Sequence, residues 1–380
     1  MNLELSEEQQ MLQKSVREFA ESEVRPMAKE NDEKAHFPHE LFRKAAELGL
    51  TGVAFPEAEG GAGFDHVAYS IVIEEISRCC ASTGVILSVQ NSLFCDPIHR
   101  YGTEEQKKKF LLPFTRGEKI GCYALTEPQA GSNAAALQTK AVKKGDSYVI
   151  NGTKAWITNG GVADAAIVYV NTDAAKGEKG ITALVVEKGT PGFRVGKEEK
   201  KLGISATACS ELVFSECEVP AGNRIGNEGE GYRVALSTLD GGRIGIAAQA
   251  TGIAQGAFEA ALKYSQERMA FGHPIAQFQA IQFMLADMAT EIDAARLLVR
   301  KAAWKQDSGA RFSLEASTAK LFASEMATRV AHKAIQIHGG YGYSREYSVE
   351  RAYRDARITE IYEGTSEIQR LVIAAWVLKG

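Results

Sequence analysis

The chain has 380 residues, of which 45% are hydrophobic and 24% are charged, and its formal net charge is −4. This length predicts two or three domains with an ample core, and the slight acidity argues against a nucleic-acid-binding protein. No apolar run reaches 18 residues, which excludes a membrane-spanning helix. The six cysteines form no C-x-x-C pair and no metal-like spacing with histidine, so we expect reduced core thiols and no metal site.

From its start to about residue 120 the sequence has helical periodicity, which predicts an N-terminal α-helical domain over residues 1–120. Ser6 is placed to cap the first helix, whose apolar stripe includes Val16 and Phe19. The glycine-rich stretch 57–63 is acidic and lacks the Gly-Lys-Ser/Thr ending of a phosphate-binding loop. We therefore interpret it as an ordinary loop.

Residues 121–230 contain short β-rich runs, which predict a middle domain built as a small β-barrel or sandwich. Turn signals such as Asn151-Gly152 separate these runs. Residues 231–380 return to helical periodicity and predict a C-terminal four-helix bundle domain, with long helices over residues 243–268, 277–306 and 313–338. The order of helices, sheet and helices indicates an α+β protein rather than an alternating Rossmann fold.

One carboxylate near the end of the chain suggests chemistry. Glu363 follows the apolar pair Ile361 and Tyr362 and precedes Gly364. Partial desolvation beside apolar side chains raises a carboxyl pKa toward the range of a general base. The glycine allows another molecule to approach the backbone closely. The alternative is that this segment is only a helix end followed by a solvated turn.

Four separated segments resemble the signature motifs of the acyl-CoA dehydrogenase family. They are Tyr123–Ser132 with Trp156-Ile157-Thr158, Arg268–Ile275 with Gln279, Gln336–Tyr343 continuing to Arg351 and Asp355, and Glu363-Gly364-Thr365. The resemblance covers essentially the whole chain and is closest to the short-chain, butyryl-CoA type. One position departs from it, because the family usually has aspartate after Gly-Ser and this chain has the uncharged Asn133.

The resemblance implies oxidation of a short-chain acyl-CoA to the trans-2-enoyl-CoA. Glu363 would remove the α-proton while hydride passes from Cβ to N5 of bound FAD, and an electron-transferring flavoprotein would then collect the electrons. Some branched-chain relatives carry their base at the position of Gly242, so Glu363 has no competitor here. The alternatives are an acyl-CoA oxidase that reduces oxygen, a medium- or branched-chain preference, and a non-catalytic scaffold on the same fold.

The resemblance divides the expected FAD-binding residues into groups. Those at the flavin ring are Tyr123, Leu125, Thr126, Gly131, Ser132, Trp156, Ile157 and Thr158, although a tryptophan in a β-run is often only core. Those on the pyrophosphate and adenine side are Arg268, Phe271, Gln279, Gln336, Ile337, Gly339 and Gly340, with Thr365 and Glu367 completing the set. In relatives the second group comes from a neighbouring subunit, which implies a homotetramer. His338 is interpreted as a loop filler rather than a catalyst.

The substrate contacts implied by the resemblance lie on both sides of the base. They are Ser132, Asp240, Arg243, Gln249, Tyr362 and Gly364. The Glu363 N–H would also donate to the thioester oxygen, and Gln249 would shorten the acyl cavity. The alternative for Asp240 and Arg243 is an acid at a helix N-terminus and a solvated arginine.

The chain start bears on localisation. Residues 1–8 are acidic and lack the apolar core of a signal peptide, so we expect a cytoplasmic protein. A processed mitochondrial matrix protein stays open, although Met1 favours the bacterial cytoplasm. The expected partners are the acyl-CoA substrate and an electron-transferring flavoprotein.

Overall fold

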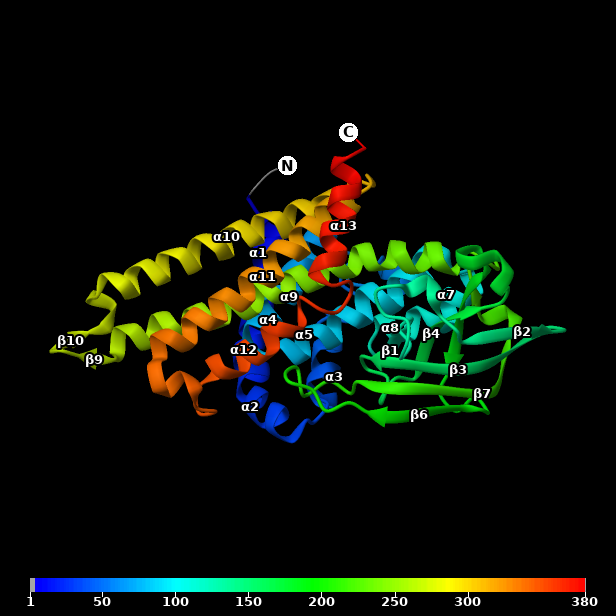
Figure 1. Cartoon of the computed structure of the whole chain (residues 1–380), viewed down its shortest axis with the longest axis horizontal. Coiled ribbons are helices and arrows are strands. Elements are labelled where there is room, and N and C mark those ends of the chain that lie inside the picture. Colours follow the sequence, from blue (N-terminus) through cyan, green and yellow to red (C-terminus); the bar gives the residue numbers. More distant parts are fainter. Residues whose placement is uncertain (1–3, 380) are drawn as a thin grey trace.

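The chain forms helices in its first part, a β-sheet in its middle and helices again in its last part (Figure 1). The computed structural model describes residues 4–379, so Met1 lies outside the described part. The first helices are α1 (Glu7–Phe19), α2 (Arg25–Lys34), α3 (His39–Glu47), α4 (His66–Cys79), α5 (Ala81–Ser88), α6 (Asp96–Tyr101), α7 (Glu104–Phe110) and α8 (Leu112–Thr115). The predicted cap of α1 is confirmed, because the Ser6 hydroxyl accepts the Gln9 N–H and the Gln9 side chain accepts the Ser6 N–H.

The middle of the chain forms one mixed sheet. Its strands are β1 (Gly121–Ala124), β2 (Lys140–Lys144), β3 (Ser147–Ile157), β4 (Ala165–Asn171), β5 (Ile181–Glu187), β6 (Phe193–Glu198), β7 (Ser210–Pro220) and β8 (Arg224–Ile225). The strand order is β6-β7-β3-β2-β4-β5-β8, and β1 pairs with β4 in parallel. The predicted β domain is therefore present, as a single sheet with β6 and β8 at the ends of that order.

The central strand β4 is buried on both faces. Ile167 and Tyr169 pack toward the helices against Phe94, whereas Val168 and Val170 pack into a separate core within the sheet. This two-sided burial explains why the strand reads as a continuous apolar run instead of an alternating one.

The prediction of a turn at Asn151-Gly152 is wrong. Strand β3 continues through both residues, and its pairing with β7 shifts register between Ile150 and Gly152. The Asn151 side chain bonds across the sheet, where its Oδ1 accepts the Glu216 N–H at 2.8 Å. A Cβ at Gly152 would lie 2.5 Å from the Thr139 hydroxyl oxygen, so the glycine allows close strand contact rather than a reversal.

The C-terminal helices are α9 (Gly231–Glu267), α10 (Gln279–Asp307), α11 (Ser313–His338), α12 (Ser348–Ile358) and α13 (Ser366–Val377). A hairpin of β9 (Met269–Ala270) and β10 (His273–Pro274) joins α9 to α10. Within the described residues the bundle thus has three long helices and two short ones. The bounds of α11 are those predicted, whereas α10 begins two residues later and α9 twelve residues earlier than predicted. None of the helices within residues 4–379 is both long and apolar enough to cross a bilayer.

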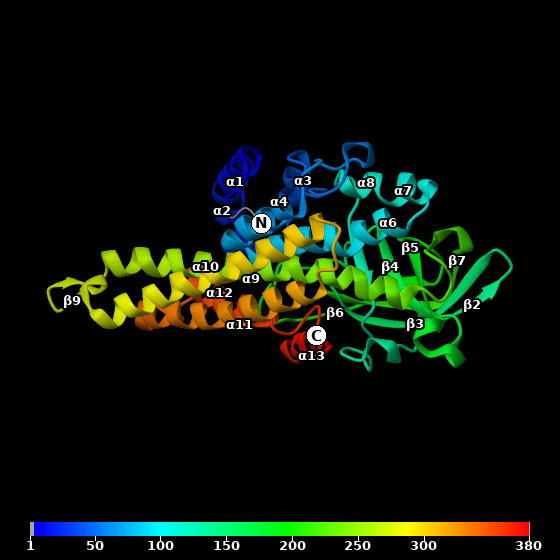
Figure 2. The same ribbon diagram turned by 90° about the horizontal axis from the view of Figure 1, so that it is seen from above.

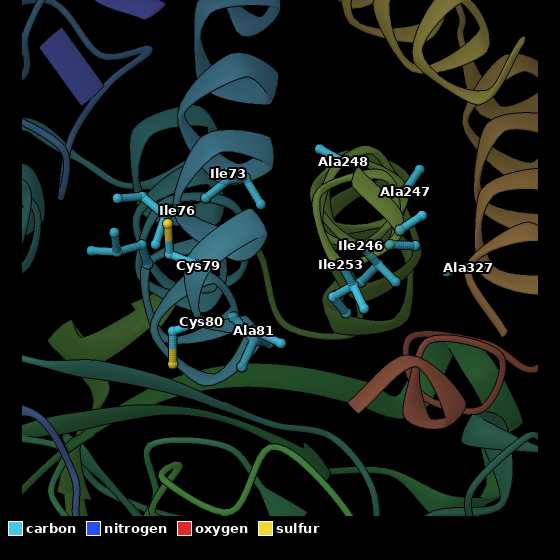
Figure 3. Close-up of a cluster of buried hydrophobic side chains, with 14 of the residues drawn as sticks. Ile73, Ile76, Cys79, Cys80, Ala81, Ile246, Ala247, Ala248, Ile253 and Ala327 are labelled. Carbon is cyan, nitrogen blue, oxygen red and sulfur yellow. The ribbon is translucent and has the colours of Figure 1, made fainter. Parts of the chain in front are cut away.

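Helix α9 runs along the long direction of the molecule and lies between α4 and α11 (Figures 1 and 3). Ile246 and Ile253 of α9 belong to the same core as Ile73 and Ile76 of α4. The first and last helical segments therefore share one hydrophobic core. All six cysteines are buried and free.

Candidate active site

Glu363 sits in a tight turn between α12 and α13. The turn is left-handed at two successive residues, with φ of +52° at Glu363 and +94° at Gly364. Thr365 then caps α13 by accepting the Ile368 N–H. A left-handed conformation costs a non-glycine residue on the order of 1 kcal/mol, and such strain is typical of functional sites.

The turn presents a carboxylate oxygen without a partner. Glu363 as a residue is partly exposed, but its Oε2 atom is buried and has no hydrogen-bond partner among residues 4–379. Buried polar atoms are usually satisfied, so an orphaned carboxylate oxygen needs an explanation. One explanation is that this oxygen contacts a bound molecule instead of water.

Helix α9 approaches this carboxylate through Gly242. A Cβ at Gly242 would lie 2.2 Å from Glu363 Oε2 and 2.8 Å from Leu93 Cδ2. Only glycine leaves room for the acid at this point. The position at which the family resemblance puts an alternative base therefore faces the carboxylate of Glu363 directly.

Burial raises the pKa of Glu363 to about 7, and the positive charges of Lys320 and Arg243 oppose this rise. Arg243 is buried, and its Nη1 lies 2.7 Å from Asp240 Oδ1 within α9. It is therefore not the solvated arginine of the alternative interpretation, and Asp240 lies well inside the helix. A carboxyl group with a pKa near neutrality can accept a proton at physiological pH.

Two further turns of α9 lead to a polar end wall. The Gln249 side chain is fully buried, and its Nε2 donates to the Ala81 carbonyl at 2.9 Å. The Tyr362 hydroxyl donates to the Gln249 Oε1. Gln249 lies about 10 Å along the helix from Gly242, at about 1.5 Å per residue. Gln249 and Tyr362 thus place an amide–phenol pair farther along α9 than Gly242, which faces the Glu363 carboxylate.

Three of the predicted ring-binding residues, Trp156, Thr126 and Thr158, are partly or largely exposed on the β domain. Trp156 is 58% exposed although it lies in β3, and its φ is +61°. The hydroxyls of Thr126 and Thr158 have no hydrogen-bond partner in residues 4–379. An exposed indole with two free hydroxyls fits a flat ring with a polar rim, and it excludes the core interpretation of Trp156.

The loop before these residues is braced from beneath. Lys154 is fully buried and donates to the Leu125 carbonyl at 3.0 Å and to Glu127 Oε1 at 2.7 Å. Gly131 and Ser132 lie exposed beyond this brace, whereas Ile157 is in the core. Tyr123 is partly buried, and its hydroxyl donates to the Ala235 carbonyl of α9.

Three sequence models of acyl-CoA dehydrogenase domains match this chain: the N-terminal domain over residues 6–118, the middle domain over 122–217 and the C-terminal domain over 229–378. The chain belongs to the acyl-CoA dehydrogenase family. It is 52% identical to the short-chain specific acyl-CoA dehydrogenase of Clostridium acetobutylicum, with all of both chains covered. It is 53% identical to the mitochondrial short-chain specific enzyme of Homo sapiens, covering all of this chain and 92% of that protein.

Solved structures agree with the α+β fold. Butyryl-CoA dehydrogenase from Megasphaera elsdenii matches with a TM-score of 0.98 and 47% identity over 100% of both chains. A chain from the structure described as the electron transferring flavoprotein of Acidaminococcus fermentans matches with a TM-score of 0.99 and 49% identity, again over both whole chains. The protein is accordingly an enzyme of flavin-dependent acyl-CoA dehydrogenation.

Within a single chain of this protein, the two groups of predicted flavin-binding residues do not come together. Arg268, Phe271 and Gln279 are exposed at the β9–β10 end, opposite the sheet (Figures 1 and 2). The stretch 336–340 ends α11, where Ile337 faces the core and Gln336, Gly339 and Gly340 are exposed. Thr365 and Glu367 lie instead beside the base, and Glu367 is exposed.

His338 has a structural position. It is buried at the end of α11, its Nδ1 is 2.8 Å from the Ala334 carbonyl, and its ring stacks on Tyr264 at 4.3 Å. These contacts agree with its interpretation as a filler.

Sequence reasoning missed a large cavity next to Asp240. It has a volume of about 900 Å³, and Arg100, Lys179, Arg233 and Arg311 contribute cations to its lining. The four residues come from four separate segments of the chain, so no local motif announces them. Sequence reasoning also missed Lys320 of α11, which is fully buried beside Glu363.

Proposed function

We propose that this enzyme oxidises a short-chain acyl-CoA to the trans-2-enoyl-CoA, with Glu363 as the base that removes the α-proton. The observation that carries the proposal is the buried, unpartnered Oε2 of a carboxyl group whose pKa is about 7. The Glu363 N–H also has no acceptor among residues 4–379. It can therefore donate to a thioester oxygen, a type of contact worth about 2.7–4 kcal/mol in a transition state.

The flavin in this proposal is FAD. Trp156, Thr126 and Thr158 would hold its ring, and when bound it supplies the acceptor for the hydride from Cβ. The residues at the β9–β10 end would hold the pyrophosphate and adenine of an FAD bound to another subunit. A homotetramer, or at least a dimer, follows from this proposal.

The CoA part of the substrate would occupy the cavity beside Asp240. A volume of about 900 Å³ suits a large ligand, and Arg233 and Arg311 offer guanidinium groups that bind phosphates. The cavity reaches α9 at Asp240, two residues before Gly242, so a chain leaving it along this helix would arrive at Glu363.

The Gln249–Tyr362 pair would limit acyl length. A bulky buried amide that is tied to two partners resists displacement by a longer chain. We expect butyryl-CoA to exceed octanoyl-CoA in kcat/KM, with each methylene worth about 1–3 kcal/mol. Gln249→Ala should reduce this ratio, and equal turnover of both substrates by the wild type would contradict the assignment.

The proposed base is tested by anaerobic titration of the FAD-loaded protein with butyryl-CoA. The wild type should lose its flavin absorbance, and Glu363→Gln should bind the thioester with almost no bleaching. Normal bleaching by the variant would place the base elsewhere.

An electron-transferring flavoprotein is the proposed acceptor. The likeness to a chain from an electron-transferring flavoprotein structure supports it. Reduced protein should be reoxidised quickly by such a flavoprotein and slowly by air. Stoichiometric hydrogen peroxide from butyryl-CoA in air would indicate an oxidase instead.

A further inference from the structure

A buried lysine holds the turn that carries Glu363. Lys320 lies two turns into α11, its side chain is fully buried, and its Nζ donates to the Gly364 carbonyl at 2.6 Å. A buried ammonium group is costly to desolvate, and burial lowers the pKa of Lys320 to about 8. Burial of such a charge lowers the stability of the folded protein, which suggests that the charge serves a function.

The same carbonyl has a second donor. The Nε2 of Gln369, on α13, lies 2.9 Å from the Gly364 oxygen and 3.4 Å from the Glu363 oxygen. A Cβ at Gly364 would be 2.6 Å from this Nε2, so the amide closes tightly over the turn. The ammonium group of Lys320, from α11, and the neutral amide of Gln369, from α13, therefore both hold the left-handed Glu363-Gly364 turn.

The charges around Glu363 distinguish the two donors. Arg243 faces it from α9, and the hydroxyl-bearing rings of Tyr69, Tyr123 and Tyr362 face it from α4, β1 and its own turn. The charge of Arg243 is offset by the ion pair with Asp240.

Lys320 has no such offset. It faces the carboxylates of Glu360 and Glu367 and the cation of Arg243 as well as Glu363. Among residues 4–379, however, no carboxylate lies within ion-pair distance of its Nζ. Unlike Arg243, Lys320 is therefore a positive charge next to the buried acid without an ion pair in the described residues.

We propose that Lys320 is a positioning residue, which holds the Glu363-Gly364 turn and favours the ionised form of the buried Glu363 carboxyl group. The proposal rests on the role of Glu363 as the base. Gln369 also donates to the Gly364 carbonyl, but it carries no charge that could act on Glu363.

The test compares Lys320→Met with Gln369→Met in FAD-loaded protein. Each change removes one donor to the Gly364 carbonyl, but only the first removes a charge. The measurement is kcat/KM for butyryl-CoA from pH 5.5 to 9.5, with FAD content and melting temperature recorded for each variant.

For Lys320→Met we expect the acidic limb of the profile to move to higher pH. Relative to the wild type, its kcat/KM at pH 6 should fall at least about tenfold further than at pH 9, because one pH unit of displacement is a factor of ten below both pKa values. Gln369→Met should lower kcat/KM by a similar factor at every pH. Lys320→Arg should restore the wild-type limb.

A purely structural lysine gives a different result. An unmoved limb in Lys320→Met, or an equal displacement in Gln369→Met, would overturn the proposal. If Lys320→Met does not fold, Lys320→Gln, which keeps a neutral donor, must show the displacement. Failure of Glu363 as the base is recognised separately, because Glu363→Gln would then bleach normally.

Discussion

The backbone at Glu363 lowers the local stability of the fold at the residue proposed as the base. A left-handed glutamate and an unpaired buried oxygen both raise the free energy of the folded state. The sequence motif pointed to this residue as a candidate base because its neighbours are close in the chain. It gave no sign of Lys320, since a lysine in a regular helix usually faces solvent and only the packing of α11 against the turn buries it.

Replacing the base should stabilise the protein in a pH-dependent way. The folded pKa of about 7 exceeds the ordinary value of 4.5, so the folded chain holds a proton that the unfolded chain releases. This group therefore costs the wild type stability as pH rises from about 4.5 to 7, by up to roughly 3 kcal/mol. Glu363→Gln should match the wild type near pH 4.5 and melt at a higher temperature at pH 8. A lower melting temperature at pH 8 would contradict this account.

Among the elements, α9 shows most directly how a helix can serve a site. Its glycines weaken helix propensity, but they allow close approach to neighbours such as the Glu363 carboxylate at Gly242 and the Arg78 carbonyl at Gly256. Periodicity predicted the long helices, and α11 best of all, because a regular apolar stripe over many turns has few competing interpretations. Asn151-Gly152 misled the prediction because a local turn signal cannot reveal that β7 pairs with the same stretch.

Two adjacent glycines of α9 provide a matched pair of variants. A Cβ at Gly242 would collide with the Glu363 carboxylate, whereas one at Gly241 would meet only Gln306 Nε2 at 3.7 Å. Gly241→Ala should stabilise the helix by up to about 1 kcal/mol and keep activity. Gly242→Ala should displace the base and lower kcat/KM for butyryl-CoA by about 100-fold. The measurements are steady-state kinetics and melting temperature at equal FAD content, and equal activities of the two variants would refute the reasoning.

At the scale of the whole molecule, the β9–β10 hairpin, which carries part of the second group of predicted flavin residues, lies at one end, away from the sheet that carries the first group (Figure 2). No amount of sequence periodicity could show this, because it depends on how α9 spans the molecule. Phe271 is 91% exposed at the tip of the hairpin, which suits a residue covered by another subunit.

Flavin affinity should therefore depend on assembly. Diluting the FAD-loaded protein should release flavin in step with dissociation, as seen by flavin fluorescence and size-exclusion chromatography. Arg268→Gln should weaken FAD binding by about 10- to 100-fold through the loss of a charged contact to phosphate. Lys263→Gln, at the same end of α9 and exposed, is the control and should leave binding unchanged. Monomers that keep their flavin on dilution would exclude a shared site.

The distribution of thiols has a practical consequence. All six cysteines are inaccessible, and all lie between residues 79 and 217, so the long C-terminal helices contain none. An alkylating reagent should leave the native protein unmodified and react only where a segment transiently opens. Mass spectrometry of the labelled peptides would then report, cysteine by cysteine, whether the sheet or the first helices unravel earlier on heating.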